Sequence, residues 1–191
     1  MYADASAGLA WFEPAVPEHC FANHLLRDAG QVVMGRRMYE LMSYWDELDL
    51  DNDETPDVEV EFARFWRETP KHVVSRGRPT LGPNAVLLAG DVVEAVRIMR
   101  EANGPPILLG AGADLFATLA EAGLIDDFRF LIAPVAIGQG MAMFASLTQP
   151  LRLRLSNSRQ FDSGAVLLEY VRTPPAPDPA KPVGRGSNEP A

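Results

Sequence analysis

The 191-residue sequence lacks a long hydrophobic run. No apolar stretch reaches the roughly 18 residues that a membrane-spanning helix needs, so we expect no membrane partner. Residues 1–19 have no basic start followed by an apolar run, and so they do not resemble a secretory signal. These absences predict a cytoplasmic protein.

Cysteine and basic side chains are also scarce. Cys20 is the single cysteine, which excludes an internal disulfide framework and fits a reducing compartment. A lone cysteine is more often a small buried side chain than a nucleophile. The 17 Lys and Arg are outnumbered by 26 Asp and Glu, for a formal net charge of −9. Because nucleic acid requires clustered cations, we expect no nucleic-acid partner, although a few placed arginines still suffice for a small anion.

Metal-ligand spacing is missing as well. The acidic stretch 46–61 places aspartates at alternate positions, as in a calcium loop, but Glu54 and Val60 stand where such a loop needs Gly and Glu. We interpret the stretch as a solvated loop that leads into a helix with an acidic first turn. No His, Cys and carboxylate cluster has metal spacing, so no metal is expected, and the three histidines are interpreted as structural or surface residues.

What is present is an ordinary globular composition, with 47% hydrophobic residues. The length suits one domain with a sizeable core. Residues 173–191 hold six of the 16 prolines and almost no large apolar side chains. Such a segment cannot bury enough surface to offset its ordering entropy, so we predict a folded domain over 1–172 and a disordered tail over 173–191.

Short apolar runs alternate with helical patterns through the predicted domain. The runs without strict alternation are typical of strands covered on both faces, as in a parallel sheet, and they span 31–35, 71–75, 85–89 and 106–110. Helices are predicted over 17–29, 36–44, 57–67, 91–103 and 112–122, with Asp91 as a cap and Glu94 completing a capping box. Three longer strands follow at 126–135, 151–160 and 165–172. The pattern predicts an α/β domain with a mainly parallel sheet and an antiparallel C-terminal edge.

Two predicted strands end in basic or hydroxyl side chains. Gly35, Arg36 and Arg37 follow the first apolar run, and Ser75 and Arg76 follow the second. In open α/β sheets, ligands bind outside the carboxyl ends of parallel strands, where arginine can hold a phosphate bidentately. Surface arginines at loop ends are an equally good interpretation of the same residues.

A third strand end carries small residues. The stretch "LLGAGADLF" (108–116) is not the dinucleotide fingerprint GxGxxG, because Leu115 stands at the last glycine position. Gly110, Ala111, Gly112 and Ala113 would still let a ligand approach the backbone, and the free N–H groups that open the next helix would attract a phosphate.

Together these segments resemble the dihydrofolate-reductase-like superfamily, in its branch related to the reductase domain of riboflavin biosynthesis. The resemblance is carried by "VVMGRRMYELMSYW" (32–45), "HVVSRG" (72–77) and the run from "PPILLGAGADLF" to "PVAIGQGMAMF" (105–144). It implies a three-layer α/β/α fold, a homodimer, and an NADPH-dependent oxidoreductase that passes a hydride to a small heterocyclic substrate. The implied substrate is similar to that of 5-amino-6-(5-phosphoribosylamino)uracil reductase.

The resemblance also implies the cofactor site. Gly35, Arg36 and Arg37 would approach the cofactor phosphates, and Ser75 and Arg76 would lie near the adenosine 2′-phosphate, which favours NADPH over NADH. The residues implied on the nicotinamide and pyrophosphate side, with the last packing behind, are Gly110, Ala111, Gly112, Ala113 and Leu115. Trp11 and Phe12 are candidate substrate-side residues, with core burial as the alternative, and no residue is assigned as the proton donor.

Three departures from the family pattern bear on activity. Met38 stands where the family often has threonine, and Ala111 where it commonly has a second glycine. Met1 falls just after the turn that follows the family's first strand, so that strand is expected to be missing, either through a late start codon or through truncation. Two other functions therefore stay open: a dihydrofolate-reductase-type activity, and a non-catalytic nucleotide-binding or dimerisation module.

Overall fold

The structure is a computed structural model that describes residues 3–4, 8 and 11–173. The predicted tail lies outside the described residues, apart from Thr173. The helices are α1 Val16–Asp28, α2 Arg36–Met42, α3 Tyr44–Glu47, α4 Asp57–Glu68, α5 Val92–Glu101 and α6 Ala113–Glu121. The strands are β1 Ala3–Asp4, β2 Gln31–Gly35, β3 Lys71–Val74, β4 Ala85–Leu88, β5 Ile107–Gly110, β6 Asp127–Ile132, β7 Gly140–Met141, β8 Leu153–Gln160 and β9 Val166–Arg172.

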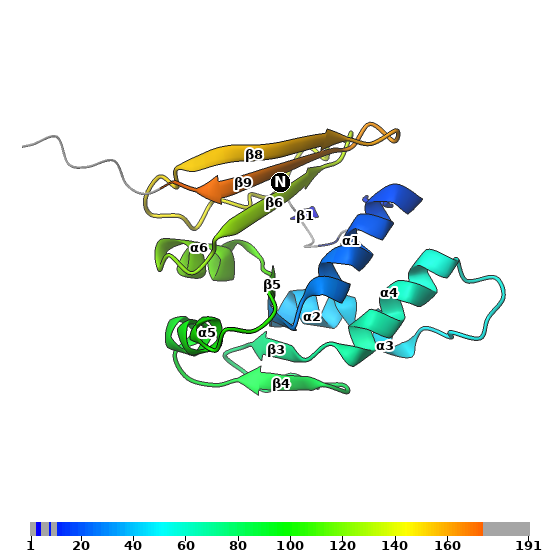
Figure 1. The fold of residues 1–191 in the computed structure, drawn as a ribbon, viewed down its shortest axis with the longest axis horizontal. Helices are drawn as coiled ribbons and strands as arrows, with labels where there is room; N and C mark the ends of the chain where they lie inside the picture. The colour runs from blue at the N-terminus through cyan, green and yellow to red at the C-terminus, as the bar shows by residue number, and fades with distance from the viewer. Residues whose placement is uncertain (1–2, 5–7, 9–10, 174–191) are drawn as a thin grey trace, which may run out of the picture.

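The strands form one parallel and one antiparallel sheet, with a small β1–β7 pair beside them (Figure 1). The parallel sheet has the order β4-β3-β2-β5, and the antiparallel sheet has the order β6-β9-β8. The predicted α/β class, with a mainly parallel sheet and antiparallel C-terminal strands, is confirmed. One detail differs: the antiparallel strands form a sheet of their own, because β5 and β6 do not pair with each other.

Helices cover both faces of the parallel sheet. Val32 and Met34 of β2 pack in a core that includes Trp66 of α4, whereas Val33 points the other way, toward Val96 of α5 and Leu119 of α6. Alternate side chains of a strand lie on opposite faces, so α1 and α4 cover one face while α5 and α6 cover the other. The predicted three-layer α/β/α arrangement follows from this alternation.

The predicted helices are found with shifted ends. Asp91 caps α5 as predicted, since its Oδ1 accepts from the amide nitrogens of Val93 at 2.8 Å and Glu94 at 3.3 Å. The Glu94 carboxylate pairs with Arg97 instead of closing a capping box. The helix predicted over 36–44 ends at Met42, because Ser43 donates its hydroxyl to the Glu40 carbonyl at 2.8 Å and a separate short helix, α3, begins at Tyr44.

Candidate active site

The carboxyl ends of β3, β2 and β5 lie side by side at one edge of the parallel sheet. Gly35, the last residue of β2, is paired with Val74, so Ser75 follows directly beside it. On the other side of β2, Met34 is paired with Gly110, the last residue of β5. The structure thus brings together the three predicted strand-end segments, which are far apart in the sequence.

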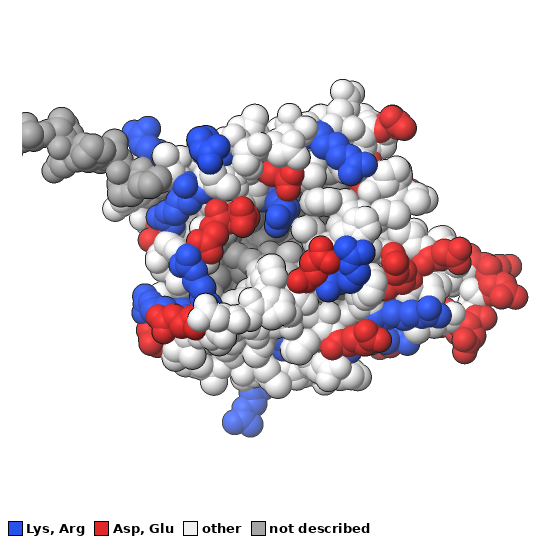
Figure 2. All heavy atoms as spheres, viewed as in Figure 1, with Lys and Arg blue, Asp and Glu red and all other residues white. Residues whose placement is uncertain are grey.

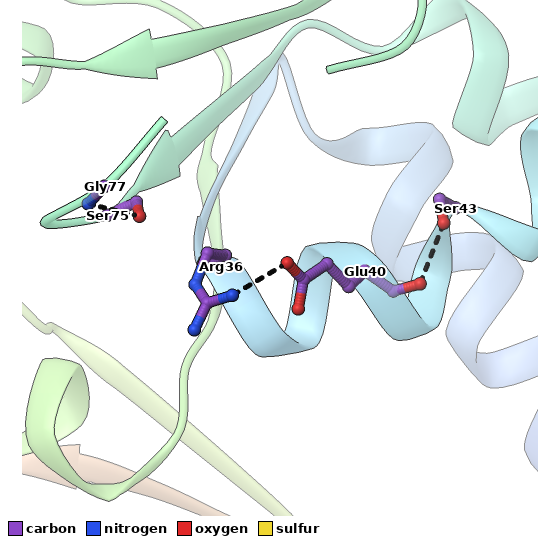
Figure 3. A network of polar contacts seen from close by, with 5 residues as sticks. All are labelled: Arg36, Glu40, Ser43, Ser75 and Gly77. Carbon is purple, nitrogen blue, oxygen red and sulfur yellow. Dashed lines mark hydrogen bonds and ion pairs between the residues drawn. The ribbon is translucent and has the colours of Figure 1, made fainter. Parts of the chain in front are cut away.

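Open space lies over the end of β2. A Cβ atom at Gly35 would meet no atom within 4 Å, and the Gly35 backbone, at φ −73° and ψ 152°, is available to any residue. Arg36 and Arg37 follow on the exposed first turn of α2. The Arg36 guanidinium is held toward its own helix, because Nη1 donates to Glu40 Oε1 at 3.0 Å (Figure 3). Among the residues that the structure describes, Arg37 has no ion-pair partner.

The chain turns sharply after β3. Gly77 donates its backbone N–H to Ser75 Oγ at 3.1 Å, which closes a short hydroxyl-stabilised turn beside the start of α2 (Figure 3). Arg76 lies within this turn and is exposed. No carboxylate in the described part of the chain pairs with Arg76, so its guanidinium is available to a ligand.

The third strand end is more crowded than the first. A Cβ atom at Gly110 would lie 3.5 Å from Met34 Cβ and 3.7 Å from Met38 Cγ, which is ordinary contact distance. Gly112 precedes α6 without a side-chain cap, so the first N–H groups of α6 have no side-chain acceptor. Leu115 packs in the core with Val33.

A cleft of about 1150 Å³ opens beside this edge and runs between β5 and β6. Figure 2 shows the molecule hollowed between the two layers of strands, with acidic and basic side chains at the rim of the hollow and a second group of acidic side chains over the loop between α3 and α4. Trp11 and Phe12, both partly buried, lie in the cleft wall, and their role toward a substrate stays a prediction. Met38 and Ala111, two of the three departures from the family pattern, lie there too.

Aromatic side chains that the sequence analysis left without a role form part of the same wall. The Phe144 ring lies 5.6 Å from that of Phe116 and 5.5 Å from that of Phe130, centroid to centroid, and all three line the cleft. Phe144 is half exposed. The sequence predicted a strand over 126–135, but which face of it would line a cleft depends on contacts between distant segments.

Glu18 is a second feature that the sequence did not reveal. It is 3% exposed, near the start of α1, and its Oε1 accepts a hydrogen bond from Ser163 Oγ. Its Oε2 has no hydrogen-bond partner within the described residues. Glu18 lines a smaller cavity of about 300 Å³ that shares Trp11 and Phe12 with the cleft. A buried carboxylate with a free oxygen can accept a hydrogen bond from a ligand or hold a proton.

The described residues offer neither a helix suited to a bilayer nor a cluster suited to a metal ion. No helix there combines the length and the apolar character needed to cross a bilayer. No group of three or more His, Cys, Asp or Glu side chains there is arranged to hold a metal ion.

The helical layers and the mainly parallel sheet agree with the fold class that the resemblance implied. Within that class, the sequence pattern of the RibD C-terminal domain family matches residues 11–167, so the chain belongs to the RibD C-terminal domain family. The chain is 30% identical over 145 residues to the uncharacterized protein YyaP of Bacillus subtilis (strain 168), which is 76% of this chain and 75% of YyaP.

Solved structures agree on the fold. A putative riboflavin biosynthesis protein from Shewanella sp. PV-4 superposes with a TM-score of 0.65 at 19% identity, over 90% of this chain and 92% of that chain. A diaminohydroxyphosphoribosylaminopyrimidine deaminase/5-amino-6-(5-phosphoribosylamino)uracil reductase from Thermotoga maritima gives a TM-score of 0.62 at 15% identity. The latter match covers 90% of this chain but 53% of the Thermotoga protein.

Proposed function

We propose that this protein is an NADPH-dependent reductase that passes a hydride to a small heterocyclic substrate. The observation that carries the proposal is the meeting of three strand ends, from β2, β3 and β5, at one edge of the parallel sheet. Ligands of open α/β sheets bind at this edge, and arginine holds phosphate oxygens bidentately. Membership of a reductase-like family supports the same function.

The residues at this edge fit a dinucleotide that carries three phosphates. The space over Gly35 admits a pyrophosphate, and the uncapped start of α6 offers backbone N–H donors to it. Arg76, in the turn with Ser75, is free to bind an adenosine 2′-phosphate, which would distinguish NADPH from NADH. When bound, NADPH supplies the hydride, and the chain binds and orients the two reactants.

The substrate would lie in the cleft, beside Gly110 and Ala111. Its wall is aromatic at Trp11, Phe12 and Phe144, which suits a flat heterocycle. A pyrimidine-type riboflavin precursor is the substrate we propose, by similarity to the family. Glu18 lines the smaller cavity next to Trp11 and Phe12, and its buried, unpartnered Oε2 is the candidate group to accept a hydrogen bond from the substrate.

A calorimetric titration with NADPH and NADH tests the proposal. We expect NADPH to bind more tightly than NADH, and Arg36→Ala to weaken NADPH by about tenfold, the size of one charge-assisted hydrogen bond. Arg64→Ala, on the exposed side of α4, is the matched control and should leave the Kd for NADPH unchanged. Failure of both dinucleotides to bind would overturn the proposal. Binding without turnover of pyrimidine or dihydrofolate substrates would instead indicate a non-catalytic nucleotide-binding module.

A further inference from the structure

The segment that joins β7 to β8 forms part of the cleft wall without being a helix or a strand itself. It begins after Met141 and ends before Leu153. The Leu147 N–H donates to the Phe144 carbonyl at 3.2 Å, which closes a turn near the start of the segment. Met143 and Phe144 of this turn line the cleft. The conformation of the turn therefore determines which side chains the cleft presents on this side.

One side of the segment packs on α6. Met143 and Leu147 lie in the core that contains Phe116 of α6. Phe144, which lies between them in the sequence, is half exposed and keeps part of its ring open to the cleft. Apolar burial thus places the segment against α6, but it does not cover the ring that faces a ligand.

Two carboxylates of α6 bind the polar side of the same segment. Asp114 Oδ1 accepts a hydrogen bond from Ser146 Oγ at 2.6 Å. Glu121 Oε1 accepts two from Thr148, one from the backbone N at 2.6 Å and one from Oγ1 at 2.9 Å. Asp114 and Glu121 are separated by about two helical turns, and so they lie on the same side of α6. The helix therefore holds the segment at two points directly after Phe144.

The place of Glu121 at the end of a helix does not explain its contact. α4 and α5 also end in glutamate, at Glu68 and Glu101, and both are exposed and belong to no ion pair within the described residues. Hydrogen bonds from Thr148 lower the pKa of Glu121 below its usual 4.5, so this carboxylate is charged at neutral pH. Glu121 is exposed, and exposed polar contacts add little to stability. What its contacts determine is the geometry of the segment.

We propose that Asp114 and Glu121 are positioning residues for the substrate, because they hold the turn that presents the Phe144 ring to the cleft. The inference rests on the proposed function, and it adds that the flat heterocycle stacks on Phe144. This ring already meets two other rings at centroid distances of 5.5 and 5.6 Å, within the range of about 4.5–7 Å for paired aromatic groups. A substrate ring on its exposed part would extend the same cluster. Neither carboxylate touches the substrate, so both act through Phe144.

The test measures KM and kcat with NADPH and 5-amino-6-(5-phosphoribosylamino)uracil. Phe144→Ala should raise the KM for the pyrimidine about tenfold, because the stacking contact is lost. Glu121→Ala should raise this KM about fivefold and leave kcat and the Kd for NADPH within about twofold of the wild type, because only substrate binding changes. Glu68→Ala removes a carboxylate from the same position of α4; it is the matched control and should leave KM unchanged.

Two further variants separate positioning from a general loss of structure. Glu121→Gln retains Oε1 as an acceptor for Thr148 and should bring KM back to within about twofold of the wild type. In the double variant of Glu121→Ala and Phe144→Ala, KM should equal that of Phe144→Ala alone, because Glu121 acts through the ring. The Tm of Glu121→Ala should stay within about 2 °C of the wild type, since the contact is exposed.

Hydrogen exchange adds a measurement that needs no substrate. The Thr148 amide donates to Glu121, so it should exchange about tenfold faster in Glu121→Ala than in the wild type. An unchanged exchange rate, additive effects of Glu121→Ala and Phe144→Ala on KM, or a lower kcat at constant KM would overturn the inference in an active enzyme. Failure of the proposed function is a different result, in which the wild type itself reduces neither the pyrimidine nor dihydrofolate, and it would overturn the inference as well.

Discussion

Arg36 and Glu40 form an ion pair across one turn of α2, with 3.0 Å between Nη1 and Oε1, at the edge where the strand ends meet. Both side chains are about half exposed, at 48% each. The pair holds the guanidinium toward α2, and so it places a carboxylate in competition with any phosphate that Arg36 would bind.

Glu40→Gln should therefore tighten NADPH binding. Exposed ion pairs contribute about 0.2–1 kcal/mol, so releasing Arg36 should lower Kd by no more than about fivefold. Titration of the variant and the wild type at the same ionic strength measures the change. A higher Kd in the variant would show that Glu40 positions Arg36 for NADPH binding and does not compete with the phosphate for Arg36.

Arg76→Ala should separate the two dinucleotides. If Arg76 binds the 2′-phosphate, its loss weakens NADPH by about tenfold and leaves NADH unchanged, because NADH lacks that phosphate. The ratio of the two dissociation constants is the measurement. If NADPH and NADH binding were weakened equally, Arg76 would instead contact the pyrophosphate or stabilise the fold.

Gly35→Leu should block the site without harming the fold. The backbone angles of Gly35 suit any residue, and a Cβ atom there meets no atom within 4 Å, so Tm should stay within about 2 °C of the wild type. The larger side chain would fill the space that we assign to the pyrophosphate, and NADPH binding should be lost. Unchanged binding in the folded variant would place the dinucleotide elsewhere.

Glu18→Gln should lower turnover without lowering stability. The amide keeps a partner for Ser163 and removes a buried carboxylate whose Oε2 is unpartnered, so Tm should be unchanged or higher. If Oε2 accepts a hydrogen bond from the substrate in the transition state, the amide NH2 in its place cannot, so kcat should fall about tenfold while the Kd for NADPH stays constant. An unchanged kcat would remove Glu18 from the proposed chemistry.

His72 should make stability depend on pH near neutrality. Burial lowers the pKa of His72 in β3 below its usual 6.5, so the unfolded chain binds the proton at a higher pH than the folded chain does. Between the folded pKa and 6.5 the unfolded state holds more protons, and stability therefore rises with pH through this window. Urea unfolding between pH 5 and 7.5 should show this slope, and His72→Gln should flatten it.

A carboxylate acts in a separate, more acidic window. Hydrogen bonds from Asn157 and Arg129 lower the pKa of Glu169 below its usual 4.5, so its contribution to stability is present above 4.5 and is lost as pH falls through the folded pKa. A slope in the His72→Gln variant that persists above pH 5.5 would contradict the assignment to His72.

Local pattern was enough to predict most of the elements. The apolar run 31–35 coincides with β2, and Asp91 caps α5, because strand runs and N-caps depend on neighbouring residues. The break between α2 and α3 was not predicted, since it depends on one side-chain hydrogen bond from Ser43. The chain folding over 1–172 as one domain and the homodimer stay predictions, the second of which light scattering measures directly.

The candidate site also has residues that the sequence predicts and residues that it does not. The strand-end residues could be found from sequence, because a parallel sheet necessarily aligns the ends of its strands. The Glu18 contact could not, since its partner Ser163 is 145 residues away. The separation of the sheets at β5 and β6 also could not be predicted from either strand alone, because strand pairing depends on two distant segments.

A crystal structure of the protein grown with NADPH tests the central claim most directly. The account predicts the 2′-phosphate within hydrogen-bond distance of Ser75 or Arg76, the pyrophosphate over Gly35, and the nicotinamide against Gly110 and Ala111 beside the cleft. A dinucleotide bound away from the ends of β2, β3 and β5, or no bound dinucleotide at saturating concentration, would contradict it.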